Sequence, residues 1–205
     1  MKSIKLFLNL PITSVTVNLN CFEILCMRFT LLLMFAVASL AANAQPAGIT
    51  GKAKIYLVRH AEKQSGDDPL LTAEGNTRAG DLMRALKDKN MRHIYVTGYR
   101  RTQNTADSLR LQLSIDTVHY LADTSCIDLF KKIAAQHDRS KSILIIGHSN
   151  TVPLIIRKLG VAGYPLDNLP DKEFDNLFLV RFRKSKAYVV KVKYGFSSGV
   201  SATMQ

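Results

Sequence analysis

Cysteine is scarce in this chain, which has three cysteines among its 205 residues. Cys21 and Cys26 lie in an N-terminal part that we predict to be removed, so the remainder holds Cys126 alone. A domain with one cysteine has no intramolecular disulfide and no cysteine-based metal site. The ligand spacing of zinc fingers is absent, and so is the aromatic and basic signature of RNA-reading domains. We therefore expect no nucleic-acid partner.

The apolar run over residues 29–40 is shorter than the roughly 20 residues that span a bilayer. It follows the dipeptide Met27-Arg28 and precedes Ala-Asn-Ala at residues 42–44. A basic start, a short apolar core and an A-x-A site are typical of a secretory signal peptide. We predict a signal peptide over residues 27–44 with cleavage at its end. The protein is then exported, periplasmic or extracellular, and has no membrane contact after cleavage.

Residues 1–26 form an extension ahead of this signal, so the true start is either Met1 or Met27. An uncleaved membrane anchor is the alternative interpretation, and the short core with its cleavable exit argues against it. Removal of residues 1–44 leaves 161 residues, which is the size of one domain with its own core. We expect a lead-in over residues 45–53, a domain over residues 54–196, and a tail over residues 197–205.

Acidic residues are also in deficit, because the whole chain has 28 basic and 16 acidic side chains. Lys2, Lys5, Arg28 and Glu23 lie in the part predicted to be removed, which leaves 25 basic against 15 acidic residues and a net charge of +10. Such a balance suits nucleic acid, an anionic membrane surface or a phosphorylated small substrate. The charge is dispersed except at residues 181–186, which we interpret as a solvated hairpin between two strands.

Hydrophobic periodicity predicts strands that alternate with helices. We expect strands over residues 55–58, 93–97, 117–121, 142–146, 178–182 and 188–194, and helices over residues 72–89, 101–113, 126–136 and 151–159. This order predicts a three-layer α/β/α sandwich with a mostly parallel central sheet and antiparallel C-terminal strands. In the third helix we expect Ile127, Phe130 and Ile133 to point inward.

Basic side chains follow three of these strands directly. Arg59 and His60 end the first strand, Arg100 and Arg101 come just after the second, and His148 follows the fourth. The carboxyl ends of parallel strands meet at one edge of a sheet, so these side chains should converge. Two imidazoles and two guanidiniums suit phosphoryl transfer without a metal, because an imidazole can attack phosphorus while arginines hold the oxygens. We expect no metal and no other cofactor.

In these residues the chain resembles the histidine phosphatase superfamily, which has the phosphoglycerate mutase-like fold. That family opens with Arg-His-Gly or Arg-His-Ala, matched by residues 59–61. Residues 69–79 are similar to its Leu-Thr-x-x-Gly-x-x-Arg-Ala element, and residues 97–106 to its Ser-x-x-x-Arg-Ala-x-Gln-Thr-Ala block. Its late Gly-His block is matched by residues 147–150. The resemblance covers residues 54–194.

The resemblance implies that His60 is the nucleophile and becomes a phosphohistidine. It implies that Arg59, Arg101 and His148 complete the phosphate pocket. Alignment of the second block gives the phosphate-binding role to Arg101 rather than to Arg100. Three other histidines match no block, and we interpret them as ordinary surface or strand residues: His93, His119 and His137.

The proton donor for the leaving group is open at this point. In the family it is usually a carboxyl in a loop near the pocket. Asp123, which follows the third predicted strand, is our leading candidate, and Glu62 and Asp128 are alternatives. A cap on the following helix is an equally good interpretation of Asp123. The chain here departs from the Glu-containing block of the mutases.

These observations predict an exported phosphomonoesterase that hydrolyses a small-molecule or glycan phosphate ester. One alternative is phosphoryl transfer of the phosphoglycerate mutase type. That activity requires retention of the product, and the family's mutases use added segments over the site, whereas the connections here are short. The other alternative is a non-catalytic module that binds a phosphate ligand.

Overall fold

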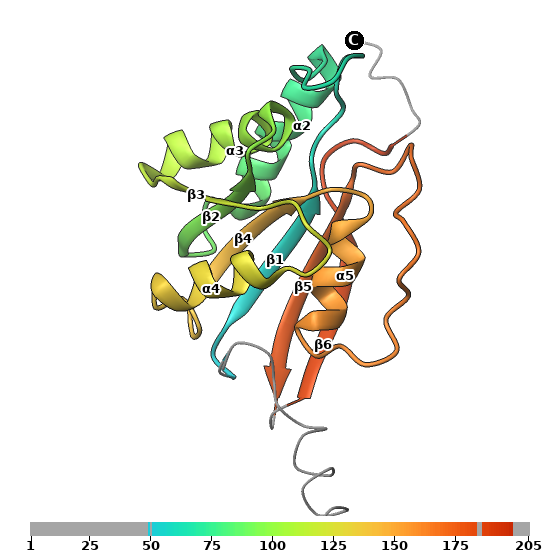
Figure 1. Ribbon diagram of the computed structural model, residues 1–205. Helices are drawn as coiled ribbons and strands as arrows, with labels where there is room; N and C mark the ends of the chain where they lie inside the picture. The colour runs from blue at the N-terminus through green and yellow to red at the C-terminus, as the bar shows by residue number, and fades with distance from the viewer. Residues whose placement is uncertain (1–48, 50, 184–185, 199–205) are drawn as a thin grey trace, which may run out of the picture. The chain divides into compact units, whose positions relative to one another are not determined.

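The computed structural model describes residues 49, 51–183 and 186–198 (Figure 1). The predicted signal peptide over residues 27–44 and most of the predicted tail lie outside the described residues, and the domain boundaries stay a prediction. In the described part of the chain, no helix is both long enough and apolar enough to cross a membrane.

Strands and helices alternate along the chain as the periodicity predicted (Figure 1). The strands are β1 (Lys54–Arg59), β2 (Met91–Thr97), β3 (Thr117–Tyr120), β4 (Ser142–Gly147), β5 (Asn176–Arg183) and β6 (Lys186–Lys193). The helices are α2 (Ala73–Leu86), α3 (Arg100–Leu113), α4 (Ile127–Ala135) and α5 (Thr151–Lys158).

These strands form a single mixed sheet in the order β3-β2-β4-β1-β5-β6. The first four in that order are parallel, whereas β5 is antiparallel to β1, and β6 is antiparallel to β5. The register aligns Arg59, the last residue of β1, with Gly147, the last residue of β4. The predicted mostly parallel sheet with antiparallel C-terminal strands is confirmed, and the ends of β1, β2 and β4 share one edge.

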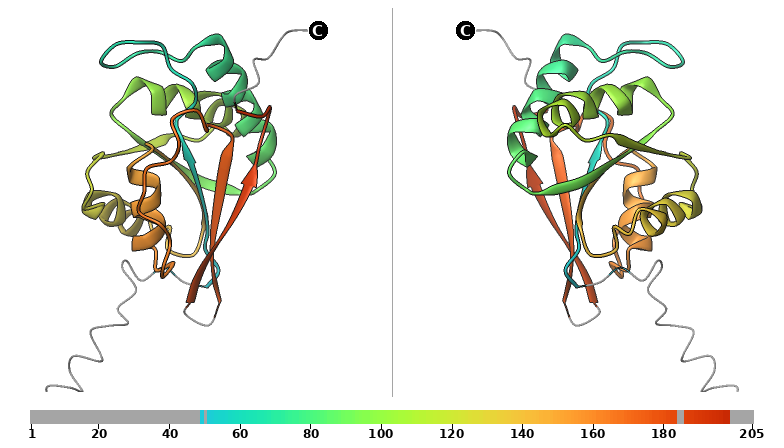
Figure 2. Two further views of the ribbon diagram at one scale, coloured as in Figure 1. Left: turned by 90° about the vertical axis from the view of Figure 1, so that its right-hand side faces the viewer. Right: turned by 90° about the vertical axis from the view of Figure 1, so that its left-hand side faces the viewer.

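Side chains of β1 alternate between two apolar cores. Ile55 and Leu57 belong to the core that α4 and α5 cover, whereas Tyr56 and Val58 belong to the core that α2 and α3 cover. Figure 2 shows α4 and α5 side by side, away from α2 and α3. Strands that are buried on both faces read as continuous apolar runs, as β1 and β4 do. The sheet is therefore the middle of three layers.

Helix α2 begins directly after Thr72, the first residue of the predicted helix. The Thr72 hydroxyl accepts a hydrogen bond from the Gly75 backbone N–H at 3.1 Å, and Glu74 lies in the first turn, where the helix dipole favours an anion. A Cβ at Gly75 would lie 2.1 Å from the Glu62 carbonyl oxygen, so glycine allows the helix to approach the segment that follows β1. The helix thereby packs against the chain just beyond His60.

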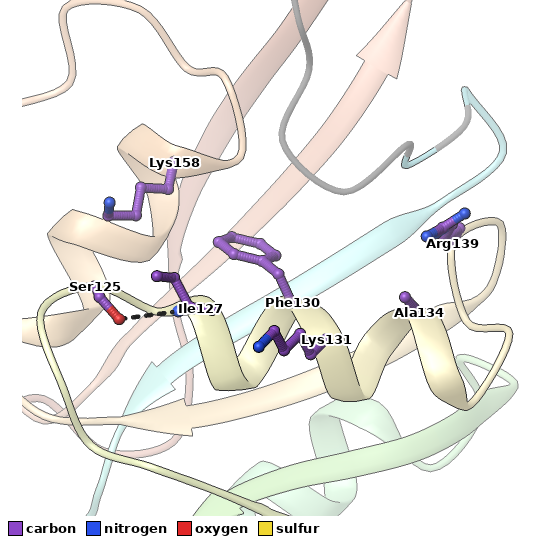
Figure 3. A pocket seen from close by; sticks show the side chains of 7 residues that line it. All are labelled: Ser125, Ile127, Phe130, Lys131, Ala134, Arg139 and Lys158. Carbon is purple, nitrogen blue, oxygen red and sulfur yellow. Dashed lines mark hydrogen bonds between the residues drawn. The ribbon is translucent and has the colours of Figure 1, made fainter.

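The prediction that Ile127 points inward was wrong, because its side chain is 57% exposed. Cys126 precedes α4 with a left-handed backbone (φ 54°), and the face of α4 that is buried carries Leu129 and Ile133. Ile127 and the half-buried Phe130 instead line a surface hollow of about 430 Å³ between α4 and α5 (Figure 3). An apolar residue in the first turn was assigned to the core by spacing alone, and spacing does not fix how the first turn is rotated.

Candidate active site

Four side chains predicted from the sequence come together at the carboxyl edge of the sheet. Arg59 ends β1, His60 follows it, Arg101 lies in the first turn of α3, and His148 follows β4. His60 is 4% exposed and His148 is 8% exposed, and their ring centroids are 5.5 Å apart. Arg59 and Arg101 both contribute to the electrostatic environment of each imidazole. The structure thus brings the four groups together at one site, and their catalytic roles stay predictions.

The orientation of the His60 ring leaves one nitrogen available for chemistry. Nδ1 lies 2.8 Å from the carbonyl oxygen of Ala61, and because a carbonyl can only accept, Nδ1 carries the proton. The same residue is held by a second contact, since the Ala61 N–H donates to Thr105 Oγ1 at 2.9 Å. Nε2 of the neutral ring therefore holds a lone pair, as a nucleophile requires.

Burial lowers the pKa of both imidazoles. The pKa of His60 falls from 6.5 to about 3, mainly through burial and further through the positive charge of Arg59, while the hydrogen bond to Ala61 opposes the change. The pKa of His148 falls to about 4, again mainly through burial and then through Arg101. Both rings are therefore neutral at pH 7, and Nε2 of His60 is unprotonated without the help of a base.

These shifts predict that stability falls with pH below 6.5. The unfolded chain takes protons on His60 and His148 near pH 6.5, whereas the folded protein takes them only at about pH 3 and about pH 4, respectively. Each histidine should lower the free energy of unfolding by up to about 1.4 kcal/mol per pH unit in that window. Denaturant unfolding at pH 7, 6 and 5, in a buffer without phosphate, measures this slope.

The matched variants for that experiment are His60→Gln and His119→Gln. The first removes one of the buried imidazoles and should make the dependence on pH shallower. His119 is exposed on β3, so its replacement should leave the slope unchanged. Equal slopes in the wild type and in His60→Gln would show that His60 is not held neutral by the fold.

Arg59 is held by the connection between α5 and β5, which sequence analysis did not place in the site. Its Nη1 donates to the carbonyl oxygens of Pro170 and Asp171, at 2.9 Å and 3.0 Å. Its guanidinium lies 4.3 Å from the ring centroid of Phe174, which is also 6.1 Å from the His60 ring. These residues belong to the connection between α5 and β5, and no periodicity or motif marks them.

Arg101 is held by an aromatic ring and a carboxylate. Its guanidinium carbon lies 4.1 Å from the ring centroid of Tyr99, and its Nη1 lies 3.9 Å from Oδ1 of Asp68. The neighbouring Arg100 has an exposed side chain, and its backbone N–H donates to the same Asp68 oxygen. Asp68 lies between the first predicted strand and the first predicted helix, where sequence analysis assigned no site residue, so this contact was missed.

Each of the two site arginines keeps one buried donor without a partner among the described residues, Nε of Arg59 and Nε of Arg101. A buried donor without an acceptor costs about 1–3 kcal/mol, and more when it is charged. Two such donors beside two imidazoles fit an anion with several acceptor oxygens, as a phosphate group has. Among the described residues no three His, Cys, Asp or Glu side chains gather as metal ligands would.

His148 is positioned by three threonines that the sequence analysis did not single out. Its Nε2 lies 3.1 Å from Oγ1 of Thr97, and that hydroxyl lies 2.9 Å from Oγ1 of Thr102. The backbone N–H of His148 donates to Thr151 Oγ1 at 2.9 Å. Thr97 opens the block that matches the family, so the resemblance itself could have pointed to it.

The three carboxylates considered as proton donors are all engaged elsewhere. Oδ1 of Asp123 accepts from Ser125 Oγ at 2.6 Å and from the Cys126 N–H at 2.8 Å, so it holds the turn that precedes α4. The hydrogen bond from Ser125 is the main cause that lowers the pKa of Asp123. These contacts favour the ionised carboxylate, which donates no proton, and the catalytic role of Asp123 stays a prediction.

Glu62 and Asp128 have similarly clear structural contacts. Both carboxylate oxygens of Glu62 accept from the guanidinium of Arg78, at 2.7–2.9 Å. Oδ2 of Asp128 accepts from the Leu121 N–H at 2.9 Å and lies 3.2 Å from Nζ of Lys132. Neither carboxylate is shown in contact with the two histidines.

The open α/β sheet carries two imidazoles and two guanidiniums at its carboxyl edge, an arrangement that can bind a phosphate group. The family model of the histidine phosphatase superfamily (branch 1) matches residues 55–129. The predicted resemblance to that superfamily is confirmed over these residues, which include Arg59, His60 and Arg101.

Solved structures support the same fold. The chain is 18% identical to the alpha-ribazole phosphatase from Shigella flexneri, with a TM-score of 0.52 over 72% of this chain and 98% of that one. It is 14% identical to the protein histidine phosphatase SixA complexed with tungstate, with a TM-score of 0.50 over 68% of this chain and 96% of that one. A search of curated proteins found no significant match.

Proposed function

We propose that this protein is a phosphomonoesterase that hydrolyses a phosphate ester through a phosphohistidine formed on His60. The observation that carries the proposal is the His60 ring, whose neutral Nε2 lies in a buried pocket with two arginine donors that lack partners. The phosphatase from Shigella flexneri and SixA support the same class of reaction. SixA holds tungstate, a tetrahedral oxyanion shaped like phosphate.

The reaction consists of two displacements at phosphorus. In the first, Nε2 of His60 forms a bond to phosphorus, and the electron pair of the breaking P–O bond goes to the leaving-group oxygen, which takes up a proton. In the second, a water oxygen bonds to phosphorus, the P–N bond breaks, and its electron pair returns to Nε2. Arg59 and Arg101 offset the charge of the phosphoryl oxygens in both steps.

The substrate class in this proposal is a small-molecule or glycan phosphate ester. Its support is the net charge of +10 over residues 45–205, which draws anionic molecules to the protein. Export is part of the same proposal and rests on the signal-like sequence over residues 27–44. Mass spectrometry of the secreted protein tests it, because a mature N-terminus at Gln45 is expected.

Hydrolysis is distinguished from its alternatives by the fate of the phosphoryl group. With p-nitrophenyl phosphate we expect release of inorganic phosphate and a covalent adduct that is stable in base and labile in acid, as a phosphorus–nitrogen bond is. Incubation with 3-phosphoglycerate and its bisphosphate tests the mutase alternative. An isomerised product without free phosphate would establish a mutase, and binding of phosphate without any adduct would establish a binding module.

A further inference from the structure

Residues 64–70 form a loop that projects where β1 ends. The loop is closed by a bridge between Lys63 and Leu71 and by a hydrogen bond from the Gln64 N–H to the Leu70 carbonyl at 3.0 Å. Figure 2 shows it at the end of the molecule at which β1 terminates, which is the end that carries His60. The loop therefore lies at the same end of the molecule as the candidate active site (Figure 2).

Asp68 is the residue by which this loop contacts the site. Its Oδ1 accepts a hydrogen bond from the Arg100 N–H at 2.9 Å and lies 3.9 Å from Nη1 of Arg101. Tyr99, the residue at the N-cap of α3, makes no capping hydrogen bond with its own side chain, so Asp68 supplies the acceptor from 32 residues away. Asp68 thus has a structural contact through one oxygen.

The other carboxylate oxygen of Asp68, Oδ2, is not engaged in the same way. The Asp68 side chain is 40% exposed, and no hydrogen bond among the described residues occupies its Oδ2. Within the described residues, this is also the carboxylate that pairs with Arg101, while Arg59 pairs with none. Asp123 and Glu62, in contrast, hold hydrogen bonds to residues other than Arg59 and Arg101.

The geometry of in-line displacement determines where a proton donor must lie relative to His60. The attacking nitrogen and the leaving oxygen lie on opposite sides of phosphorus. His60 is 4% exposed and the Asp68 side chain beside Arg101 is 40% exposed, so Asp68 is the more accessible of the two to a leaving group that faces solvent. A phosphate group held by Arg101 would lie next to Asp68, because Oδ1 of Asp68 is 3.9 Å from Nη1 of Arg101.

We propose that Asp68 gives a proton to the leaving-group oxygen and takes one from the water that hydrolyses the phosphohistidine. This inference rests on the proposed function. In the first step the Asp68 O–H bond breaks, the proton bonds to the departing oxygen, and a carboxylate is left. In the second step that carboxylate accepts a proton from the attacking water, and the carboxyl is restored with no net change.

The test compares Asp68→Asn with Asp67→Asn on two substrates. Asparagine keeps an oxygen that can accept from the Arg100 N–H but transfers no proton. The neighbouring Asp67 is exposed and carries the same charge in the same loop, so its replacement is the matched control. One substrate is p-nitrophenyl phosphate, whose leaving group departs without a proton, and the other is glycerol phosphate, whose leaving group needs one.

We expect Asp68→Asn to lower kcat/KM for glycerol phosphate about 10²–10³-fold, the range of general acid catalysis, and for p-nitrophenyl phosphate less than about tenfold. With p-nitrophenyl phosphate the phosphohistidine should also accumulate in Asp68→Asn, because no carboxylate at residue 68 then accepts the proton of the attacking water. Asp67→Asn should stay within about twofold on both substrates. Thermal unfolding of Asp68→Asn should remain close to that of the wild type.

Three results would overturn this role. Equal activity of Asp68→Asn and Asp67→Asn would leave Asp68 as a cap on α3. A loss of the same size on both substrates would show a positioning effect. The same dependence on the leaving group in Asp123→Asn, and not in Asp68→Asn, would assign the proton to Asp123. Absence of a phosphohistidine in the wild-type protein would instead refute the proposed function, so the two failures are separable.

Discussion

Replacement of His60 by alanine should reduce the turnover of p-nitrophenyl phosphate by about 10⁴-fold or more, as expected when a nucleophile is removed from a covalent mechanism. We expect no radiolabelled phosphohistidine when the variant is mixed with labelled substrate and quenched in base. The reason is geometric. Nδ1 of the buried His60 ring donates to the Ala61 carbonyl, so Nε2 keeps the lone pair that attacks phosphorus.

The matched control is His119→Ala, which removes an exposed imidazole on β3 and should keep wild-type turnover. Binding of tungstate to His60→Ala, measured by calorimetry, separates loss of chemistry from loss of the pocket, because Arg59, Arg101 and His148 remain. We expect binding to persist. Residual turnover above about one hundredth of the wild-type value, or an adduct on His148, would contradict the assignment of His60.

Most of the sheet and the four central residues could be predicted because their signals are local. An apolar run such as the one in β4, ended by Gly147 and His148, predicts both a buried strand and a polar residue at its end. Parallel pairing then brings separate strand ends to one edge without any knowledge of side-chain contacts. Arg59, His60 and His148 were found by this reasoning, and the family's blocks selected Arg101.

The contacts that hold those four residues could not be predicted in the same way. Phe174 and Pro170 reach Arg59 from more than 100 residues along the chain, in a connection whose sequence has no periodicity. Asp68 meets Arg101 only because a loop folds toward the start of α3. Such contacts depend on where loops lie in space. The same limit explains Ile127, since a left-handed residue before α4 is not visible in hydrophobic spacing.

The largest expected effect on stability comes from Arg78, whose side chain is fully buried. Its Nε and Nη2 donate to Glu62, its Nη1 donates to the Phe196 carbonyl at 3.1 Å, and its guanidinium carbon lies 4.0 Å from the Phe196 ring centroid. Glu62 lies two residues after His60, and its carbonyl accepts from the Thr72 N–H at 3.0 Å. Arg78 therefore ties α2 and the C-terminal segment to the chain just beyond the nucleophile.

Arg78→Met should lower the free energy of unfolding by about 3–5 kcal/mol, because it leaves the Glu62 carboxylate without its partner in a mostly buried place. Denaturant unfolding measures the loss. The double variant with Glu62→Gln should recover part of it, since the unpaired charge is then gone. Activity should fall as well, with kcat affected more than KM, because the segment that orients His60 loses its anchor.

The control for this prediction lies on the same helix. Arg84 pairs with Asp81 on α2, and its side chain is 60% exposed. Exposed pairs contribute little, so Arg84→Met should change stability by less than about 1 kcal/mol. A cost below about 1 kcal/mol for Arg78→Met, equal to that of Arg84→Met, would mean that Glu62 finds water or another donor when Arg78 is lost. Because Arg78 is enclosed by Glu62, Phe196 and the Tyr194 ring, we expect the two variants to differ by at least about 2 kcal/mol.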